Sequence, residues 1–280
     1  LTRRGYRATF EDVFRDWIVA NYLDETGVQD PRYRYQNLTV QVPSTDVVSS
    51  SSGWRDRTVH QFGADYIDVG GRWSTARIRF HGESATRLIA QEAHSGRAFW
   101  WSNRGDMVDT KLSRPFDLTG VSGATLNFWT WYDLEDGYDY GYVMVSTDGG
   151  ATWSMLSATS TTTENPNGNN LGTGFTGKSG GGEQARWVEE SVDLSRDAGQ
   201  RIMVRFEQVT DDAYNAPGFA VDDISIPELG YSTDAEEGDG GWFATGFVRT
   251  DGVLPQRFAL QLIRFGDDIT VEQVPLSASG

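Results

Sequence analysis

The sequence of 280 residues contains no cysteine. This absence excludes disulfide bonds, zinc sites built on thiolates and cysteine nucleophiles, and it leaves the redox compartment undetermined. Histidine is scarce, with three residues, and neither an HExxH sequence nor two histidines at i and i+4 occur. A helical zinc site is therefore not encoded in this chain. We expect His60, His81 and His94 to be surface or hydrogen-bonded residues and not members of a catalytic triad.

Long apolar runs are also missing, and no stretch approaches the roughly 18 residues that span a bilayer. The formal net charge is −16 and most acidic residues follow residue 104. Such a chain repels phosphate backbones and anionic lipids, so nucleic-acid and membrane-surface binding are disfavoured, whereas cation binding is favoured. The chain begins Leu1-Thr2-Arg3-Arg4 without a leader, which favours a processed protein or an excised piece.

One helix is predicted, over about residues 10–24. Thr9 is a suitable N-terminal cap, and apolar residues recur at helical spacing on one face. These are Phe10, Val13, Phe14, Trp17 and Ile18. The serine-rich stretch around residues 49–52 breaks regular structure, so residues 1–48 form a helix-containing segment and residues 49–63 a linker.

From residue 64 the hydrophobic period changes to two, and short β-rich segments are separated by glycine, aspartate and serine clusters. This pattern predicts a mainly β chain with an antiparallel β-sandwich over residues 64–230. Ten strands suit a jelly roll. They are 76–80, 87–90, 97–101, 110–116, 125–132, 140–146, 153–156, 187–194, 201–209 and 219–226.

Two further regions differ from this pattern. Residues 157–185 are almost all small or polar, so we expect a long excursion from the sandwich rim. Residues 231–280 predict a small C-terminal β segment with strands at 242–250, 257–265 and 268–275. Gly266-Asp267 is a two-residue turn signal between the last two.

Clustered carboxylates at predicted strand ends are the candidate metal ligands, because calcium takes six to eight oxygen ligands from several segments. The alternative is a solvated acidic rim, which is common in so acidic a chain. The candidates are Asp133, Glu135, Asp136, Asp139, Asp222, Asp223, Asp106 and Asp109.

Residues 146–153, Ser-Thr-Asp-Gly-Gly-Ala-Thr-Trp, fit the Asp-box pattern S-x-D-x-G-x-T-W. This pattern predicts a hairpin turn in which Asp148 accepts backbone N–H groups, Gly150 takes a positive φ and Trp153 covers the base. A sialidase propeller needs several such boxes, and only one occurs here.

Four tryptophans suggest a possible binding face. Trp129 and Trp131 share one face of a predicted strand, with Leu126, Phe128 and Tyr132 on the other. One of these faces must be core, so the second is either a covered interface or a platform for stacking sugars. Trp100 and Trp101 are the other two members of this set.

The strings at residues 131–143, 145–153 and 218–226 resemble the region downstream of the catalytic domain in the immune inhibitor A family of secreted bacterial metallopeptidases. Ser95-Gly96, residues 100–102 and 109–112, and the tail strings 241–250 and 254–256 match as well. The resemblance implies a MAM-like jelly roll that follows a zinc protease. It also implies that residues 10–23 are the closing helix of the peptidase unit, and that the zinc motif lies before Leu1.

The resemblance therefore implies a non-catalytic accessory region, secreted or on the bacterial cell surface, that stabilises the protease or docks its substrate. Its partners would be the upstream catalytic domain of the same polypeptide and a protein or carbohydrate ligand. Structural Ca²⁺ at residues 133–139 and Asp222 is expected, with zinc only in the upstream domain. The alternatives are a carbohydrate-binding or glycoside-acting jelly roll and a cell-surface assembly subunit.

Overall fold

The computed structural model describes residues 7–24, 27–41, 45–48, 53–70, 75 and 77–276. Residue contacts divide the chain into two compact units. The first unit combines Leu1–Ser84 with Gln256–Gly280, and the second, which we call the sandwich unit, is Ala85–Pro255. These units divide the chain differently from the segments expected from the sequence. Residues 64–84 belong to the first unit, and residues 231–280 are shared between both.

Helix α1 (Phe10–Leu23) begins at Thr9, whose hydroxyl accepts the backbone N–H of Asp12 while the Asp12 carboxylate accepts the N–H of Thr9. The C-terminal half of the helix contributes Val19 and Leu23 to the core of the first unit. The other elements are the 3₁₀ turn Pro31–Tyr33, the parallel pair β1 (Asp46–Val48) and β2 (Ile67–Val69), and the hairpin of β16 (Leu260–Arg264) and β17 (Thr270–Val274).

The apolar face predicted for this helix is only partly buried. Phe10, Val13 and Trp17 are 59%, 45% and 46% exposed. Phe10 and Phe14 contact the ring of Phe62, with centroids 5.5 and 6.0 Å apart. The aromatic residues of the first turns therefore form a surface cluster, and burial begins further along the helix.

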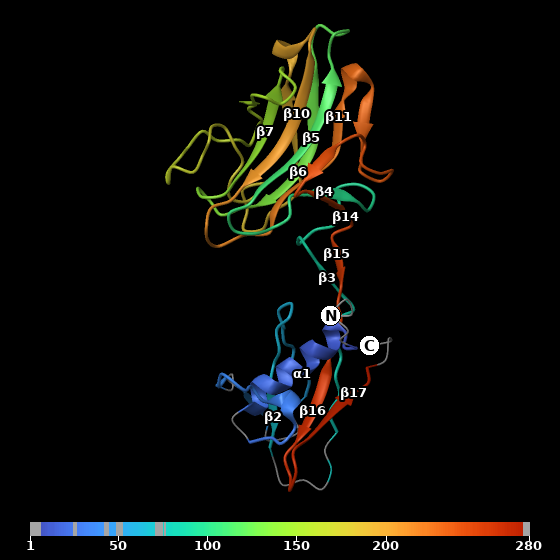
Figure 1. The fold of residues 1–280 in the computed structure, drawn as a ribbon. Coiled ribbons are helices and arrows are strands. Elements are labelled where there is room, and N and C mark those ends of the chain that lie inside the picture. The colour runs from blue at the N-terminus through green and yellow to red at the C-terminus, as the bar shows by residue number, and fades with distance from the viewer. Residues whose placement is uncertain are drawn as a thin grey trace. The chain divides into compact units, whose positions relative to one another are not determined.

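Two antiparallel sheets form the sandwich unit (Figure 1). The five-stranded sheet has the order β13 (Phe243–Thr245), β5 (Asp109–Asp117), β10 (Arg201–Val209), β7 (Tyr140–Ser146), β8 (Ser154–Met155). The six-stranded sheet has the order β14 (Val248–Thr250), β4 (Phe99–Trp101), β11 (Gly218–Ile226), β6 (Thr125–Asp133), β9 (Val188–Asp193), with β12 (Tyr231–Thr233) paired to β11. A separate pair joins β3 (Ala85–Arg87) to β15 (Val253–Pro255), and 3₁₀ turns lie at Ser195–Asp197 and Pro227–Leu229.

The strand order of the two sheets identifies the topology of the sandwich unit. Four strands of one sheet, β4-β11-β6-β9, lie opposite β5-β10-β7-β8 of the other. This is the double Greek key of an eight-stranded jelly roll. The predicted antiparallel β-sandwich with one N-terminal helix is therefore confirmed.

The core lies between the two sheets. Ile202, Val204 and Phe206 of β10 are buried at 2%, 0% and 0% exposure, on the inward face that the alternation predicts. Phe128 from the opposite sheet packs edge-on against Phe206, with centroids 4.9 Å apart. Burial of these side chains is the main stabilising term, at about 25 cal/mol per Å² of apolar surface.

Some predicted strands are wrong. Residues 77–80 contain no strand and pair with no other segment of the described chain, while residue 76 lies outside the described residues. The predicted strand 87–90 is replaced by β3, which ends at Arg87. The stretch 242–250 is two strands, interrupted at Gly246 with φ of 89°. Five residues, 265–269, join β16 to β17 in place of the predicted two-residue turn.

The polar excursion, residues 157–185, has no strand but is attached to the sandwich. The N–H and C=O groups of Phe175 pair with those of Gly141 at 2.7 and 2.9 Å, and the Phe175 side chain is fully buried. Backbone pairing therefore orders this segment despite its polar composition.

Candidate functional site

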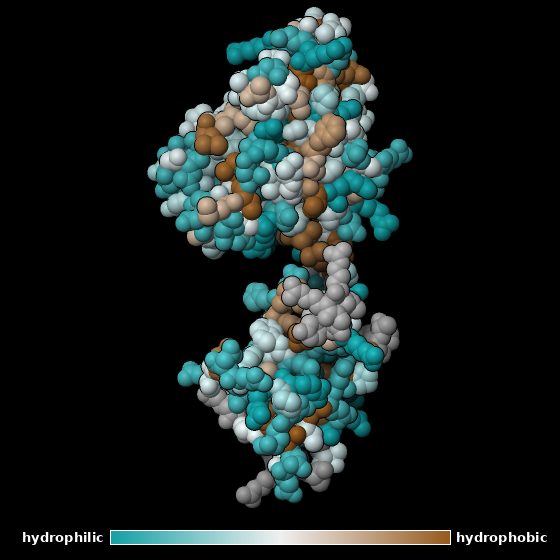
Figure 2. Space-filling model, viewed as in Figure 1, coloured by the Kyte–Doolittle hydropathy of each residue, from teal (hydrophilic) through white to brown (hydrophobic). Residues whose placement is uncertain are grey.

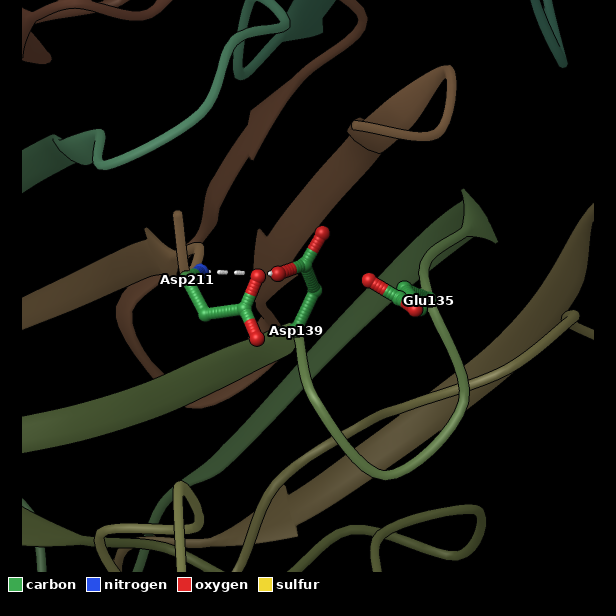
Figure 3. Close-up of side chains that lie close together, drawn as sticks. All are labelled: Glu135, Asp139 and Asp211. Carbon is green, nitrogen blue, oxygen red and sulfur yellow. Dashed lines mark hydrogen bonds between the residues drawn. The ribbon is translucent and has the colours of Figure 1, made fainter. Parts of the chain in front are cut away.

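Three carboxylates meet at one end of the sandwich (Figure 3). Glu135 and Asp139 lie in the loop between β6 and β7, and Asp211 lies just after the end of β10. Oxygen atoms of the three side chains lie within 4.8 Å of one another. Asp139 is 1% exposed, and the other two are partly buried. We call this set the carboxylate cluster.

Backbone hydrogen bonds hold the carboxylate cluster in place. The carbonyl oxygen of Glu135 accepts the N–H groups of Tyr138 and Asp139 at 3.1 and 2.9 Å, which tightens the loop. The backbone N–H of Asp211 donates to Oδ1 of Asp139 at 3.0 Å. Asn169 from the excursion donates to Oδ2 of Asp211 at 3.3 Å. Three separate chain segments therefore fix the carboxylates.

In the described part of the chain, the carboxylate cluster has no ion-pair partner. Within the described residues, no ion pair joins any of its members to a basic residue. Burial, with the charges of Asp211 and Glu135, raises the pKa of Asp139 to about 6. Burial and the nearby Asp211 also raise the pKa of Glu135. A bound cation would relieve this repulsion.

Two of the eight predicted metal ligands, Glu135 and Asp139, belong to the carboxylate cluster, and four of the others lie on the same rim. Asp133 and Asp136 line a neighbouring hollow. Oδ1 of Asp106 accepts the backbone and side-chain N–H groups of Asn215 at 3.1 and 2.8 Å. Asp109 forms an ion pair with Lys111.

Asp222 and Asp223 occupy a different environment, where they hold the segment before β4. Oδ2 of Asp222 accepts the backbone N–H groups of His94 and Ser95 at 3.0 and 3.2 Å. The two oxygens of Asp223 contact Nδ1 of His94 at 2.5 Å and the hydroxyl of Ser95 at 2.7 Å. Burial raises the pKa of Asp222 to about 7, although these backbone donors oppose the shift. Both carboxylates therefore anchor the chain.

The tryptophan face is covered. Trp100, Trp101 and Trp131 are only 4%, 6% and 1% exposed. Trp131 and Trp101 pack beneath Ile89 and Ala185 on the outer face of the six-stranded sheet. The ring of Trp129 stacks on His94 with centroids 3.7 Å apart. These contacts leave no open tryptophan pair on which a sugar could stack.

The turn after β7 is closed by side-chain hydrogen bonds. Asp148 accepts the backbone N–H and the hydroxyl of Thr152 at 2.9 and 2.6 Å, and these donors lower the pKa of Asp148. Gly150 has φ of 94°, and its carbonyl accepts the indole N–H of Trp153 at 3.0 Å. The guanidinium of Arg205 lies 3.7 Å from the Trp153 ring centre.

Residues 177–181, Gly-Lys-Ser-Gly-Gly, fit the G-x-S-x-G pattern of a nucleophile elbow. Ser179 is fully buried, and its hydroxyl donates to the carbonyl of Arg186 at 2.7 Å while it accepts the N–H of Tyr132 at 3.1 Å. It has the contacts of a structural serine and none of a nucleophile paired with histidine.

A hollow of about 720 Å³ opens beside the carboxylate cluster. Residues 133–136, 176–178 with 181–182, and 214–217 form its walls together with Arg104. We call it the rim hollow. Its lining includes three acidic residues, Asp133, Glu135 and Asp136, the two basic residues Arg104 and Lys178, and the aromatic Tyr214.

A family model described as "Immune inhibitor A-like, MAM domain" matches residues 81–252, which is more than half of the chain and covers the jelly roll. The chain belongs to the immune inhibitor A-like MAM domain family. The resemblance inferred from residues 131–153 and 218–226 is therefore confirmed.

Named relatives share this region. The chain is 31% identical over 159 residues to the pre-pro-metalloprotease PrtV of Vibrio cholerae serotype O1, covering 56% of this chain and 16% of that protein. It is 27% identical over 146 residues to immune inhibitor A of Bacillus thuringiensis subsp. alesti, covering 52% and 19%. Bacillopeptidase F of Bacillus subtilis is 28% identical over 127 residues, covering 45% and 7%. The chain thus spans less than a fifth of each of these relatives.

Asp211 was missed by the sequence analysis, although a signal was present. Asp211 and Asp212 lie just after a strongly alternating strand, β10, whereas Asp222 and Asp223, predicted at a strand end, lie in the middle of β11. An acidic pair at a strand end was the criterion that selected Asp222-Asp223, and the same criterion selects Asp211.

Proposed function

We propose that this chain is a non-catalytic accessory region of a secreted bacterial metallopeptidase, where it stabilises the protease or docks its substrate. The support is the family match across the jelly roll, together with relatives named as a metalloprotease and a peptidase. Within the described residues, no helix is long and apolar enough to cross a bilayer.

The test compares the parent polypeptide with a form that lacks residues 85–255. We expect the shortened form to hydrolyse a short peptide at a similar kcat/KM per folded molecule, but to fold in lower yield or to cleave protein substrates more slowly. The 280-residue chain alone should hydrolyse neither substrate. Hydrolysis by the isolated chain, or a deletion without any effect on yield or protein cleavage, would contradict the proposal.

The proposal includes a structural calcium ion held by Glu135, Asp139 and Asp211. Calcium prefers hard oxygen donors at about 2.3–2.6 Å, several of them carboxylates. Three carboxylates within 4.8 Å of one another, with no ion pair to a basic residue among the residues that the structure describes, suit such an ion. When bound, the ion would neutralise their charge and join the β6–β7 loop to the end of β10.

Calcium binding predicts about one ion per chain by elemental analysis of the purified protein. We expect a chelator to lower the melting temperature by about 5–10 °C, since saturation of a site at a hundred times its Kd adds about 2.7 kcal/mol. Asp139→Asn should abolish this response, and Glu164→Gln, an exposed acid elsewhere, should retain it. A metal-free protein with an unchanged melting temperature would rule out the calcium site.

A further inference from the structure

One asparagine of the polar excursion precedes a glycine. Asn167-Gly168 is the only asparagine–glycine pair in the sequence, and both residues are exposed. Asparagine is thermolabile because the next backbone nitrogen can attack its side-chain amide carbon, and a following glycine hinders that attack least. Gly168 has φ of 87°, and a Cβ added to it would meet no atom within 4 Å. The attacking nitrogen is therefore open to approach.

The hydrogen bonds of this segment leave the reacting groups free. Within the described residues, the backbone N–H of Gly168 donates no hydrogen bond. The side chain of Asn167 forms a single one there, from Nδ2 to the carbonyl oxygen of Gly137 at 3.1 Å. Asn169 differs, because the N–H of the residue after it, Asn170, is donated to a side-chain oxygen at 2.9 Å. The same segment therefore contains one reactive asparagine and one protected asparagine.

The side chain of Asn167 helps to hold the loop between β6 and β7. In this loop the N–H of Gly137 donates to the hydroxyl of Thr176 at 2.9 Å, and its carbonyl accepts Nδ2 of Asn167. Pro166 packs against the same residue, since a Cβ added to Gly137 would overlap the proline ring. An aspartate in place of Asn167 could not donate, and its charge would face the carbonyl oxygen. An isoaspartate would in addition lengthen the backbone by a methylene group and displace Pro166.

We propose that Asn167 is a site of spontaneous deamidation, and that this modification releases the excursion from the β6–β7 loop. The backbone nitrogen of Gly168 attacks Cγ of Asn167, the bond from Cγ to Nδ2 breaks, and ammonia leaves with the proton of the Gly168 N–H. Water then opens the succinimide ring at either carbonyl carbon, which gives an aspartate or an isoaspartate. The β6–β7 loop carries Glu135 and Asp139, so its release loosens the carboxylate cluster.

Peptide mass spectrometry tests the modification on the full 280-residue chain, incubated with chelator in a mildly alkaline buffer. We expect Asn167 to convert to aspartate and isoaspartate with release of ammonia, and faster as pH rises, because the deprotonated backbone nitrogen is the nucleophile. Asn169 should remain an amide in the same sample. Gly168→Ala should slow the conversion several-fold, since its methyl group hinders the attack. If Asn167 stays an amide, or converts no faster than Asn169, the proposal is overturned.

Hydrogen exchange at residues 136–139, also in chelator, tests the release. Asn167→Asp should speed exchange in this loop several-fold, because it removes the donor to Gly137. Thr163→Asp is the matched control, since it adds the same charge at an exposed position of the excursion and keeps that donor. Equal acceleration in both variants, or unchanged exchange in both, would contradict the release. Neither measurement depends on calcium or on the protease, so a failure here leaves the proposed function standing.

Discussion

Asp222 is a buried carboxyl residue whose partners are backbone groups. Its carboxylate accepts the N–H groups of His94, Ser95 and Asp223, and it is 1% exposed. Asp222→Ala would leave these donors without an acceptor, so we expect the free energy of unfolding to fall by about 2–4 kcal/mol. Urea denaturation measures the change. Glu189→Ala, on an exposed position of β9, should change stability by less than about 0.5 kcal/mol, and a similarly small loss for Asp222→Ala would refute the anchoring role.

Asp139 makes the stability of the calcium-free protein depend on pH. Its folded-state pKa of about 6 exceeds the ordinary 3.8, so the folded state binds its proton more tightly than the unfolded state. The contribution of Asp139 to the free energy of unfolding is therefore greatest below about pH 4 and is lost as pH rises through about 6.

In chelator, Asp139→Asn should therefore gain stability relative to the unaltered chain as pH rises from about 4 to about 6, and the difference should then level off. The amide oxygen can still accept the N–H of Asp211, so the variant isolates the charge. Thermal melts across this pH range measure the difference. A constant difference would mean that the carboxylate cluster carries no mutual repulsion.

At the scale of elements, Gly246 divides what the sequence predicts to be one strand. Its φ of 89° favours glycine, and an added Cβ would overlap the side chain of Thr110. We expect Gly246→Ala to cost about 1–3 kcal/mol. Gly199→Ala is the matched control, because Gly199 has φ of 79° but open space around it. Equal losses for the two variants would show that backbone strain alone, without the Thr110 contact, sets the cost.

Strands with a clear alternation are the elements that sequence predicts best. β10 begins and ends at the residues expected, and it buries one face against the opposite sheet. β7 also has the expected bounds, although it is buried on both faces. Residues 77–80 show a similar alternation but have no neighbouring strand, and pairing is a property that local pattern cannot reveal. From sequence alone, Gly246 cannot be distinguished from a loop glycine, because the overlap of an added Cβ with Thr110 appears only in the folded structure.

The site was less predictable than the fold. Glu135 and Asp139 belong to one acidic loop, so their proximity follows from sequence distance. Asp211 lies 72 residues further along and reaches Asp139 only because β10 pairs with β7. The burial of Trp100, Trp101 and Trp131 depends in the same way on segments remote in sequence.

On the scale of the whole molecule, the two units have separate cores. The large core between the sheets and the smaller one on the outer face lie within residues 85–255, whereas Val19 and Leu23 pack with Ile263 and Val271. Hydrophilic residues cover most of the viewed face, with small separate hydrophobic areas (Figure 2).

We therefore expect residues 85–255 to fold alone, with near-ultraviolet circular dichroism like that of the full chain. Removal of residues 256–280 should instead unfold the first unit and leave the sandwich unit intact, because β16 and β17 supply part of the first core. Hydrogen exchange resolved by region measures both outcomes. Loss of protection throughout residues 85–255 in this truncation would show that the units depend on each other.

The division of residues 243–250 at Gly246 also bears on aggregation. β13 and β14 are the outermost strands of their sheets on this side, and each has only three residues. A long free edge is a template on which another chain can add a strand, and very short edge strands remove that template. The turn at Gly246 sends the chain from one sheet to the other, so neither sheet offers a continuous edge here. At high protein concentration, the sandwich unit therefore does not polymerise by strand addition at the edges formed by β13 and β14.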